Sequence, residues 1–250
     1  MIRRGTLITV SDPISFAEGW RLQQWLHRER REEQQLDTLL LLEHEPVYTL
    51  GRRTAPSDVP MGEAALRVTG ASVEWVNRGG SVTFHGPGQL VGYPIVRLAD
   101  FARGVKRYVW LLEEILLRSL ERCDIEARRL EGKPGLFVDT SCGPAKIASI
   151  GVRVDRGITL HGFSLNVAVD VDRFSLIVPC GLGGIPITSM AQLLPYSVPL
   201  SFMMKLVADR FADLFQIEWD PGVVLEGMQR HAPFGSVNPR EQRTKEQIHA

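Results

Sequence analysis

Three segments of the chain have the apolar spacing of amphipathic helices. Between residues 105 and 120, apolar side chains recur every three or four positions and would form one stripe against a core. Residues 202–214 repeat this spacing over a shorter length. A third helix is predicted from its start, because Ser15 and Glu18 have the spacing of a capping box. We expect it to run into residues 27–33, whose alternating charges are typical of a solvated helix end.

Apolar runs between these helices predict β-strands. The candidates are residues 37–42, 46–51, a set of short glycine-punctuated segments within 73–96, and then 136–138, 146–154 and 158–167. We expect hairpins within 73–96, because the glycines there allow tight turns. The chain shows no internal repeat and no break in composition typical of a linker. The pattern predicts a single α/β (α+β) domain over residues 1–233, a mixed, mainly antiparallel sheet with flanking helices, followed by a polar, mobile tail over residues 234–250.

Composition excludes several classes of protein. The 250 residues are 44% hydrophobic and 23% charged, which is typical of a globular protein and not of a collagen, a coiled coil or a disordered chain. The 29 basic and 29 acidic side chains give a formal net charge of zero, so no global field attracts nucleic acid or an anionic membrane. The longest aliphatic run, residues 39–42, is too short to span a bilayer. We therefore expect no nucleic-acid partner and no membrane partner.

The three cysteines are Cys123, Cys142 and Cys180. An odd number cannot pair completely within one chain, and none has the Cys-x-x-Cys spacing that zinc or dithiol chemistry favours. The apolar stretch near the N-terminus is too short for the core of a signal peptide. These observations favour a reducing compartment, and we expect a cytoplasmic protein.

The densest cluster of unusual residues is the segment 78–90, RGGSVTFHGPGQL. Its glycines leave backbone amides open to a ligand, and Arg78 and His85 add polar side chains. The segment is not a phosphate-binding P-loop, because no Gly-Lys-Ser/Thr closes it. A pair of glycine-rich turns with a hydrogen-bonded histidine would explain the same residues.

Cys180 is the candidate nucleophile, because the sequence Pro-Cys-Gly places its thiol in a turn that a substrate can reach. Any of the three cysteines can instead be a small packing residue. Cys142 is expected in a loop, where its thiol is a second candidate for reactivity. A reactive thiol needs a neighbouring cation that favours the thiolate. Lys146, His85 and His161 are the candidates, and Lys146 is notable as a lone charge entering an apolar strand. A zinc site made from Cys180 and the histidines at positions 44, 85 and 161 is an alternative, but their spacing matches no zinc motif.

Five separated segments, in the same order along the chain, match one family. They are residues 42–51 (LEHEPVYTLG), 78–90 (RGGSVTFHGPGQL), 146–151 (KIASIG), 161–166 (HGFSLN) and 179–181 (PCG). Together they resemble the lipoyl(octanoyl) transferases. The resemblance extends from about residue 15 to about residue 215 and implies the fold of the biotin and lipoate protein ligases.

The resemblance also implies an activity and its partners. An octanoyl or lipoyl group would move from acyl carrier protein to a specific lysine of a lipoyl domain, in a 2-oxoacid dehydrogenase acyltransferase subunit or in the glycine cleavage H protein. This is the first step of endogenous protein lipoylation, and it needs no cofactor, no metal and no ATP. An acidic carrier would dock on local basic residues, of which the candidates are Arg52, Arg53, Arg128, Arg129, Arg153 and Arg156.

Site residues follow from the resemblance by position. Cys180 would accept the acyl group as a thioester, and Lys146 would lower the pKa of its thiol. The acyl site would be lined by Arg78, Gly79, Gly80, Ser81, Val82, Thr83, Phe84 and His85, by Ser149, Ile150 and Gly151, and by Gly162, Phe163 and Ser164. Ser164 stands where the family has alanine. Backbone amides at Gly79–Gly80 or Gly181 would bind the oxyanion.

Two alternatives remain at this point. An ATP-dependent lipoate or biotin protein ligase would share the fold, but it needs basic phosphate-binding residues and no nucleophilic cysteine. A non-catalytic module that binds acyl groups or carrier proteins would explain the glycine-rich segments. It would not explain why Cys180 and Lys146 both occur in matching context.

Overall fold

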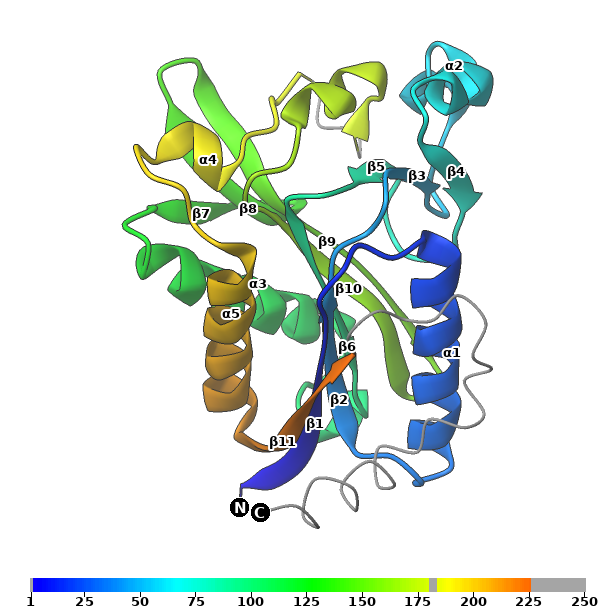
Figure 1. Cartoon of the computed structure of the whole chain (residues 1–250), viewed down its shortest axis with the longest axis vertical. Coiled ribbons are helices and arrows are strands. Elements are labelled where there is room, and N and C mark those ends of the chain that lie inside the picture. The colour runs from blue at the N-terminus through cyan, green and yellow to red at the C-terminus, as the bar shows by residue number, and fades with distance from the viewer. Residues whose placement is uncertain (1, 180–183, 226–250) are drawn as a thin grey trace.

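The computed structural model describes residues 2–179 and 184–225, which form a large sheet flanked by helices and a smaller sheet at one end (Figure 1). The large sheet has eight strands in the order β11-β1-β2-β6-β10-β9-β8-β7. Their bounds are β1 (Arg3–Val10), β2 (Asp37–Leu42), β6 (Gln89–Ile95), β7 (Ala127–Leu130), β8 (Lys133–Thr140), β9 (Gly143–Asp155), β10 (Ile158–Asn166) and β11 (Ile217–Leu225). Neighbouring strands in the part β2-β6-β10-β9-β8-β7 pair antiparallel, whereas β1 pairs parallel with both β2 and β11. The predicted fold class, a mixed and mainly antiparallel sheet with flanking helices, is confirmed.

The smaller sheet has three strands in the order β4-β3-β5. They are β3 (Val47–Leu50), β4 (Ser72–Trp75) and β5 (Val82–His85). The helices are α1 (Phe16–Arg31), α2 (Gly62–Val68), α3 (Val105–Glu121), α4 (Met190–Leu193) and α5 (Leu200–Phe215). Among the residues described, no helix is long and apolar enough to cross a membrane.

The central strand β2 shows how one apolar run serves two cores. Leu39 and Leu41 belong to the core beneath α3 and α5, while Leu40 and Leu42 belong to the core beneath α1. Because successive side chains of a strand point to opposite faces, a strand covered on both faces is apolar throughout. Helices on both faces of the large sheet therefore account for the unbroken leucine run (Figure 1).

The three predicted helices are confirmed, with ends within about two residues of the predicted ones for α3 and α5. The capping box of α1 is also present. The backbone N–H of Glu18 donates to Ser15 Oγ at 3.3 Å, and the backbone N–H of Ser15 donates to Glu18 Oε2 at 3.0 Å. In the charged segment at the end of α1, Arg28 and residues 31–33 are exposed, as predicted, whereas His27 is buried and Arg30 pairs with Asp37.

The hairpins predicted within residues 73–96 are wrong. The strands β4 and β5 both pair with β3, one on each side, and β6 joins the large sheet between β2 and β10. Residues 86–88 therefore carry the chain from one sheet to the other instead of closing a hairpin. The strand β1 and the two edge strands β7 and β11 were not predicted. The tail expected to be mobile over residues 234–250 lies outside the described residues.

Candidate active site

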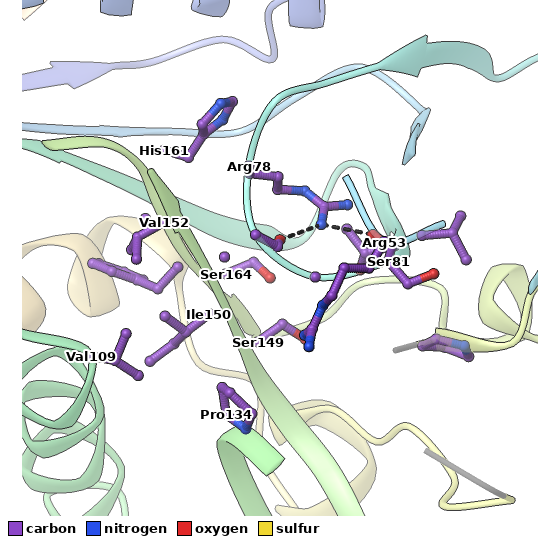
Figure 2. Close-up of a pocket in the computed structure, with 18 of the residues that line it drawn as sticks. Arg53, Arg78, Ser81, Val109, Pro134, Ser149, Ile150, Val152, His161 and Ser164 are labelled. Atoms are coloured by element: carbon purple, nitrogen blue, oxygen red, sulfur yellow. Dashed lines mark hydrogen bonds between the residues drawn. The ribbon is translucent and has the colours of Figure 1, made fainter. Parts of the chain in front are cut away.

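A cavity of about 640 Å³ lies between the two sheets and the first turns of α3. Its walls come from the loop before β5, the middle of β9 and β10, the turn that precedes β8, and Pro179. Figure 2 shows Arg78 and Ser81 on one side of this space and Val109 and Pro134 on another. Cavities of this size commonly hold a small ligand.

The cavity brings together nearly all of the predicted site residues. Those that line it are Lys146, Arg78, Gly79, Gly80, Ser81, Val82, Thr83, His85, Ser149, Ile150, Gly151, Gly162, Phe163 and Ser164. Phe84 is not among them, because its ring points into the core of the small sheet, 5.0 Å from the ring of Tyr48 and 5.8 Å from that of Phe174. Cys180 lies outside the described residues, but Pro179, which precedes it, lines the cavity.

Arg78 braces the wall in which it lies. Its buried guanidinium donates to the carbonyls of Gly79 and Ser81 at 3.1 and 2.7 Å (Figure 2). It also donates to the carbonyl of Thr49 at 2.7 Å, and to Thr49 Oγ1 from two nitrogens. The adjacent strand β9 approaches closely at Gly151, where a Cβ would lie 3.0 Å from the Gly79 carbonyl oxygen. The sequence predicts that Arg78 offers a polar group to a ligand, but its guanidinium donates to Thr49 of β3 and to two carbonyls of its own loop.

The amide of Gly79 is also committed within the wall. Its N–H donates to the carbonyl of Val152 at 3.1 Å. An amide in that position cannot also bind a developing oxyanion. Of the donors expected for the oxyanion, Gly80 and Gly181 are left, and Gly181 lies outside the described residues.

Two of the three candidate cations are neutral histidines. Burial, together with the neighbouring His44, Arg78 and His161, lowers the pKa of His85 to about 3. The hydrogen bond from His85 Nδ1 to Gln89 Oε1, at 2.6 Å, acts in the opposite direction. Burial likewise lowers the pKa of His161 to about 3. At neutral pH neither ring carries a charge, so Lys146 is the cation of the three.

His161 is held in an unusual conformation. Its φ is +58°, which is rare for a residue with a side chain. The backbone N–H donates to Gln23 Oε1 at 2.9 Å, the ring stacks on Trp20 with centroids 5.0 Å apart, and Nε2 bonds Asn77 Oδ1 at 2.8 Å. These contacts hold the ring at the border between the cavity and a second groove beside α1.

The three histidines of the alternative zinc site are hydrogen-bonded to other residues of the protein. His44 bonds Tyr93 Oη through Nε2 at 2.7 Å and the carbonyl of Ile14 through Nδ1 at 3.1 Å, and burial lowers its pKa to about 4. His85 and His161 are bonded as given above. No group of three or more metal-ligating side chains occurs in the part of the chain that the structure describes.

Lys146 is buried in the cavity wall, with only 4% of its surface exposed. Its Nζ donates to the carbonyl of Pro134 at 2.9 Å and lies 5.3 Å from the centroid of the Phe137 ring. The backbone of Lys146 is hydrogen-bonded to residues that follow the Pro-Cys-Gly sequence: its N–H donates to the carbonyl of Pro186, and its carbonyl accepts from the N–H of Thr188. Residues 186–188, which follow residues 180–183, therefore lie next to Lys146, and Pro179, which precedes them, lies in the lining of the same cavity.

The other two cysteines lie elsewhere. Cys123 is buried after the end of α3, with Sγ 3.7 Å from the sulfur of Met203, and burial raises the pKa of its thiol. Cys142 is exposed in the turn between β8 and β9. Neither is among the described residues that line the cavity. Both cysteines therefore lie away from the candidate site.

Sequence reasoning missed the apolar side of the cavity. Val105 and Val109 lie in the first turns of α3, and Val91, Tyr93 and Val152 come from the sheet. The apolar stripe of α3 was recognised and assigned to core packing. The apolar stripe of α3 extends beyond the sheet that the helix covers, and this excess length could have indicated that the two valines line a cavity.

The candidate basic residues differ in their surroundings. Arg53 lines the cavity, together with Lys133, which was not predicted. Arg128 is paired with Asp139 at 2.7 Å, and Arg129 with Glu113 at 3.0 Å. Arg53 is thus the member of the predicted set that reaches the cavity.

Comparison with known proteins identifies the family. A model of the lipoyl protein ligase A/B catalytic domain matches residues 15–212. An octanoyltransferase of Rubrobacter xylanophilus is 44% identical over 209 residues, which are 83% of this chain and 90% of that protein. The chain belongs to the octanoyltransferase family. Another member, from Thermobifida fusca, is 41% identical over 80% of this chain and 84% of its own.

Solved structures support the fold independently. The lipoate protein ligase of the archaeal lipoylation system of Thermoplasma acidophilum superposes with a TM-score of 0.67 over 89% of this chain and 88% of its own, at 14% identity. Membership of the family makes this chain an acyltransferase that acts in protein lipoylation, as the sequence predicted. The cavity described above is therefore the candidate active site.

Proposed function

We propose that the enzyme transfers an octanoyl group from the thiol of an acyl carrier protein to a lysine of a lipoyl domain, through a thioester on Cys180. One observation carries the proposal. Lys146 and Pro179, the residue before Cys180, line the same cavity, which also has an apolar side. A cation, a thiol and an apolar site in one cavity are the elements that acyl transfer through cysteine needs.

The first half-reaction loads the enzyme. The Cys180 thiolate attacks the carbonyl carbon of the octanoyl thioester, a new carbon–sulfur bond forms, and the bond to the carrier sulfur breaks. The carrier thiolate leaves with the proton that Cys180 gave up, which Lys146 holds and returns. One thioester replaces another, so the step needs no ATP.

The second half-reaction forms the product. The lysine amine of the lipoyl domain attacks the Cys180 thioester, a carbon–nitrogen bond forms, and the carbon–sulfur bond to Cys180 breaks. Lys146 receives the proton that the amine loses and passes it to the departing thiolate. The amide is more stable than the thioester, so the second step makes the overall transfer favourable.

The apolar side of the cavity supports an acyl substrate. Val105, Val109 and Ile150 all line the cavity, as Lys146 does. Burying roughly six methylenes at about 0.8 kcal/mol each would contribute roughly 5 kcal/mol of binding free energy. The length of this apolar surface would then select the chain length of the substrate.

Docking of the two protein partners needs charge at the cavity mouth. Arg53 and Lys133 lie at the cavity and suit an acidic carrier protein. We expect the reaction to weaken with added salt, because exposed charges are screened over about 10 Å at 0.1 M ionic strength. A thiol that must stay reduced agrees with a cytoplasmic location.

The test compares two acyl donors. The purified enzyme is incubated with a lipoyl domain and either octanoyl-acyl carrier protein without ATP or free octanoate with ATP, and the mass of the lipoyl domain is measured. We expect an added octanoyl group only with the carrier donor. Modification that requires free octanoate and ATP would instead assign the chain to the ligases of the same fold.

A further inference from the structure

Glu113 lies on the same face of α3 as the two valines of the cavity. Val105, Val109 and Glu113 are spaced four residues apart, so their side chains project from one side of the helix. The two valines line the cavity, while Glu113 is buried one turn further along. A buried carboxylate is costly unless it is paired and hydrogen-bonded.

Glu113 has two partners of different kinds. Its Oε2 accepts a hydrogen bond from Arg129 Nε at 3.0 Å, which balances the charge. Its Oε1 accepts from the backbone N–H of Gly135 at 2.9 Å. The first bond pairs the charged carboxylate with a cation, and the second attaches it to the beginning of β8.

The Gly135 N–H and the Pro134 carbonyl belong to the same peptide group. At the carbonyl end, Pro134 accepts the hydrogen bond from Lys146 Nζ at 2.9 Å. One planar peptide therefore stands between the Glu113 carboxylate and the Lys146 ammonium. Hydrogen bonds in such a chain polarise one another, so a carboxylate at the N–H end makes the carbonyl a stronger acceptor for the ammonium.

The local backbone keeps this peptide in place beside Lys146. Gly135 has a φ of +109°, and a Cβ there would lie 2.3 Å from the Ala148 carbonyl oxygen and 2.8 Å from Lys146 Cε. The pairing of β8 with β9 also shifts register here, since Leu136 pairs with Ala148 but Phe137 pairs with Lys146. Such a bulge redirects a side chain, and Lys146 shares a face with Phe137 instead of with the core residues on either side.

We propose that Glu113 is a positioning residue for Lys146 and acts through the Pro134–Gly135 peptide. It holds the peptide so that the carbonyl meets Nζ at the cavity wall, and its negative charge favours the protonated ammonium. Arg129 stacks on the ring of Trp110, 4.5 Å from the centroid, and holds the carboxylate from the other side. The inference rests on the role proposed above for Lys146.

The test measures how the alkylation rate of Cys180 depends on pH, by peptide mass spectrometry of the full-length enzyme treated with iodoacetamide. Glu113→Gln keeps the shape of the side chain and removes its charge, and Glu113→Ala removes both bonds. Glu114→Gln is the matched control, because Glu114 also pairs with Arg129, at 2.9 Å. Its other partner is Arg118, not the Gly135 peptide. Lys146→Met measures the full effect of losing the cation.

We expect the midpoint of the alkylation profile to stay at the wild-type value in Glu114→Gln. It should rise by increasing amounts in Glu113→Gln, Glu113→Ala and Lys146→Met. A rise of about half a pH unit for Glu113→Gln and about one unit for Glu113→Ala corresponds to roughly threefold and tenfold less thiolate below the midpoint. The control should match the wild type. Unfolding of the variants would not by itself produce a graded shift of the alkylation midpoint.

Two results would overturn the inference, and they differ in their reach. If Lys146→Met moves the midpoint and folded Glu113→Ala does not, Glu113 has no positioning role and the role of Lys146 stands. If Lys146→Met leaves the midpoint unchanged, both proposals fail. Should Glu113→Ala not fold, as judged by thermal unfolding, a Glu113→Gln profile equal to that of Glu114→Gln decides against the inference.

Discussion

Arg78 and Lys146 are two buried cations in the lining of one cavity, and the protein uses them differently. The Arg78 guanidinium is bonded to the backbone and side chain of Thr49 and to two loop carbonyls. The Lys146 ammonium donates to the carbonyl of Pro134 and lies over the ring of Phe137. A guanidinium is planar and permanently charged, whereas an ammonium on a flexible stem can lose and regain a proton. The contacts of Arg78 therefore give it a structural role, and those of Lys146 suit the proton transfer that we propose for it.

The largest expected effect is on stability, from Arg78→Met. The substitution leaves several buried acceptors of the loop without donors, and each such loss costs on the order of 1–3 kcal/mol. We expect the free energy of unfolding in urea to fall by about 3 kcal/mol or more. Arg53→Met is the control, since the Arg53 side chain is exposed. Equal unfolding free energies for the two variants would contradict the bracing role.

Substitutions of Lys146 separate its charge from its proton transfer. Lys146→Met should slow the transfer of octanoyl to the lipoyl domain by about 100-fold, the usual scale for a lost acid–base group. Lys146→Arg keeps a cation that cannot release its proton, so the Cys180 alkylation profile should stay near that of the wild type while transfer is slow. Transfer by Lys146→Met within about threefold of the wild-type rate would end the proposed role.

The histidines on the Arg78 side make stability depend on pH. Burial lowers the pKa values of His85 and His161 to about 3, from an ordinary value of 6.5. Below pH 6.5 the unfolded chain takes up protons that the folded protein does not, so the free energy of unfolding falls as the pH falls. The loss is about 1.4 kcal/mol per pH unit for each histidine, or about 2 kcal/mol at pH 5.

Urea unfolding at pH 7 and pH 5 measures this effect. The variant His161→Gln should lose less stability than the wild type over this range, because one titrating ring is gone. The same decrease in both proteins would show that His161 is not the buried neutral ring described here.

The smallest expected effect concerns the apolar side of the cavity. Val109→Phe should shorten the space for the acyl chain by about two methylenes, worth roughly 1.6 kcal/mol. The ratio of hexanoyl to octanoyl transfer should then rise about tenfold. Val68→Phe, on an exposed position of α2, is the control. An unchanged ratio in Val109→Phe would place the acyl chain elsewhere.

Local signals in the sequence predicted much of the fold. The capping box at Ser15 and the apolar stripe of α3 depend on neighbouring residues, so they could be recognised without a structure. The choice of strand partners is not local. Residues 86–88 have the composition of a tight turn, yet they join two sheets, because β5 and β6 find distant partners in β3 and β10.

The sequence predicted which residues form the candidate site, but not the role of each of them. The motifs that contain Arg78 and Lys146 do meet at one cavity. The motif could not show that Arg78 donates hydrogen bonds to the carbonyls of its own loop, because these bonds depend on the backbone conformation of residues 79–81. Glu113 gave no signal, because its contact to Gly135 joins an apolar helix to a strand that begins 20 residues further on.

The central claim is that Cys180 carries the acyl group, and intact mass spectrometry tests it most directly. The enzyme is mixed with octanoyl-acyl carrier protein, without ATP and without an acceptor, and its mass is recorded over time. The wild type and the variant Cys142→Ala should gain one octanoyl group that hydroxylamine removes, and Cys180→Ala should gain none. Equal labelling of Cys180→Ala would contradict the account.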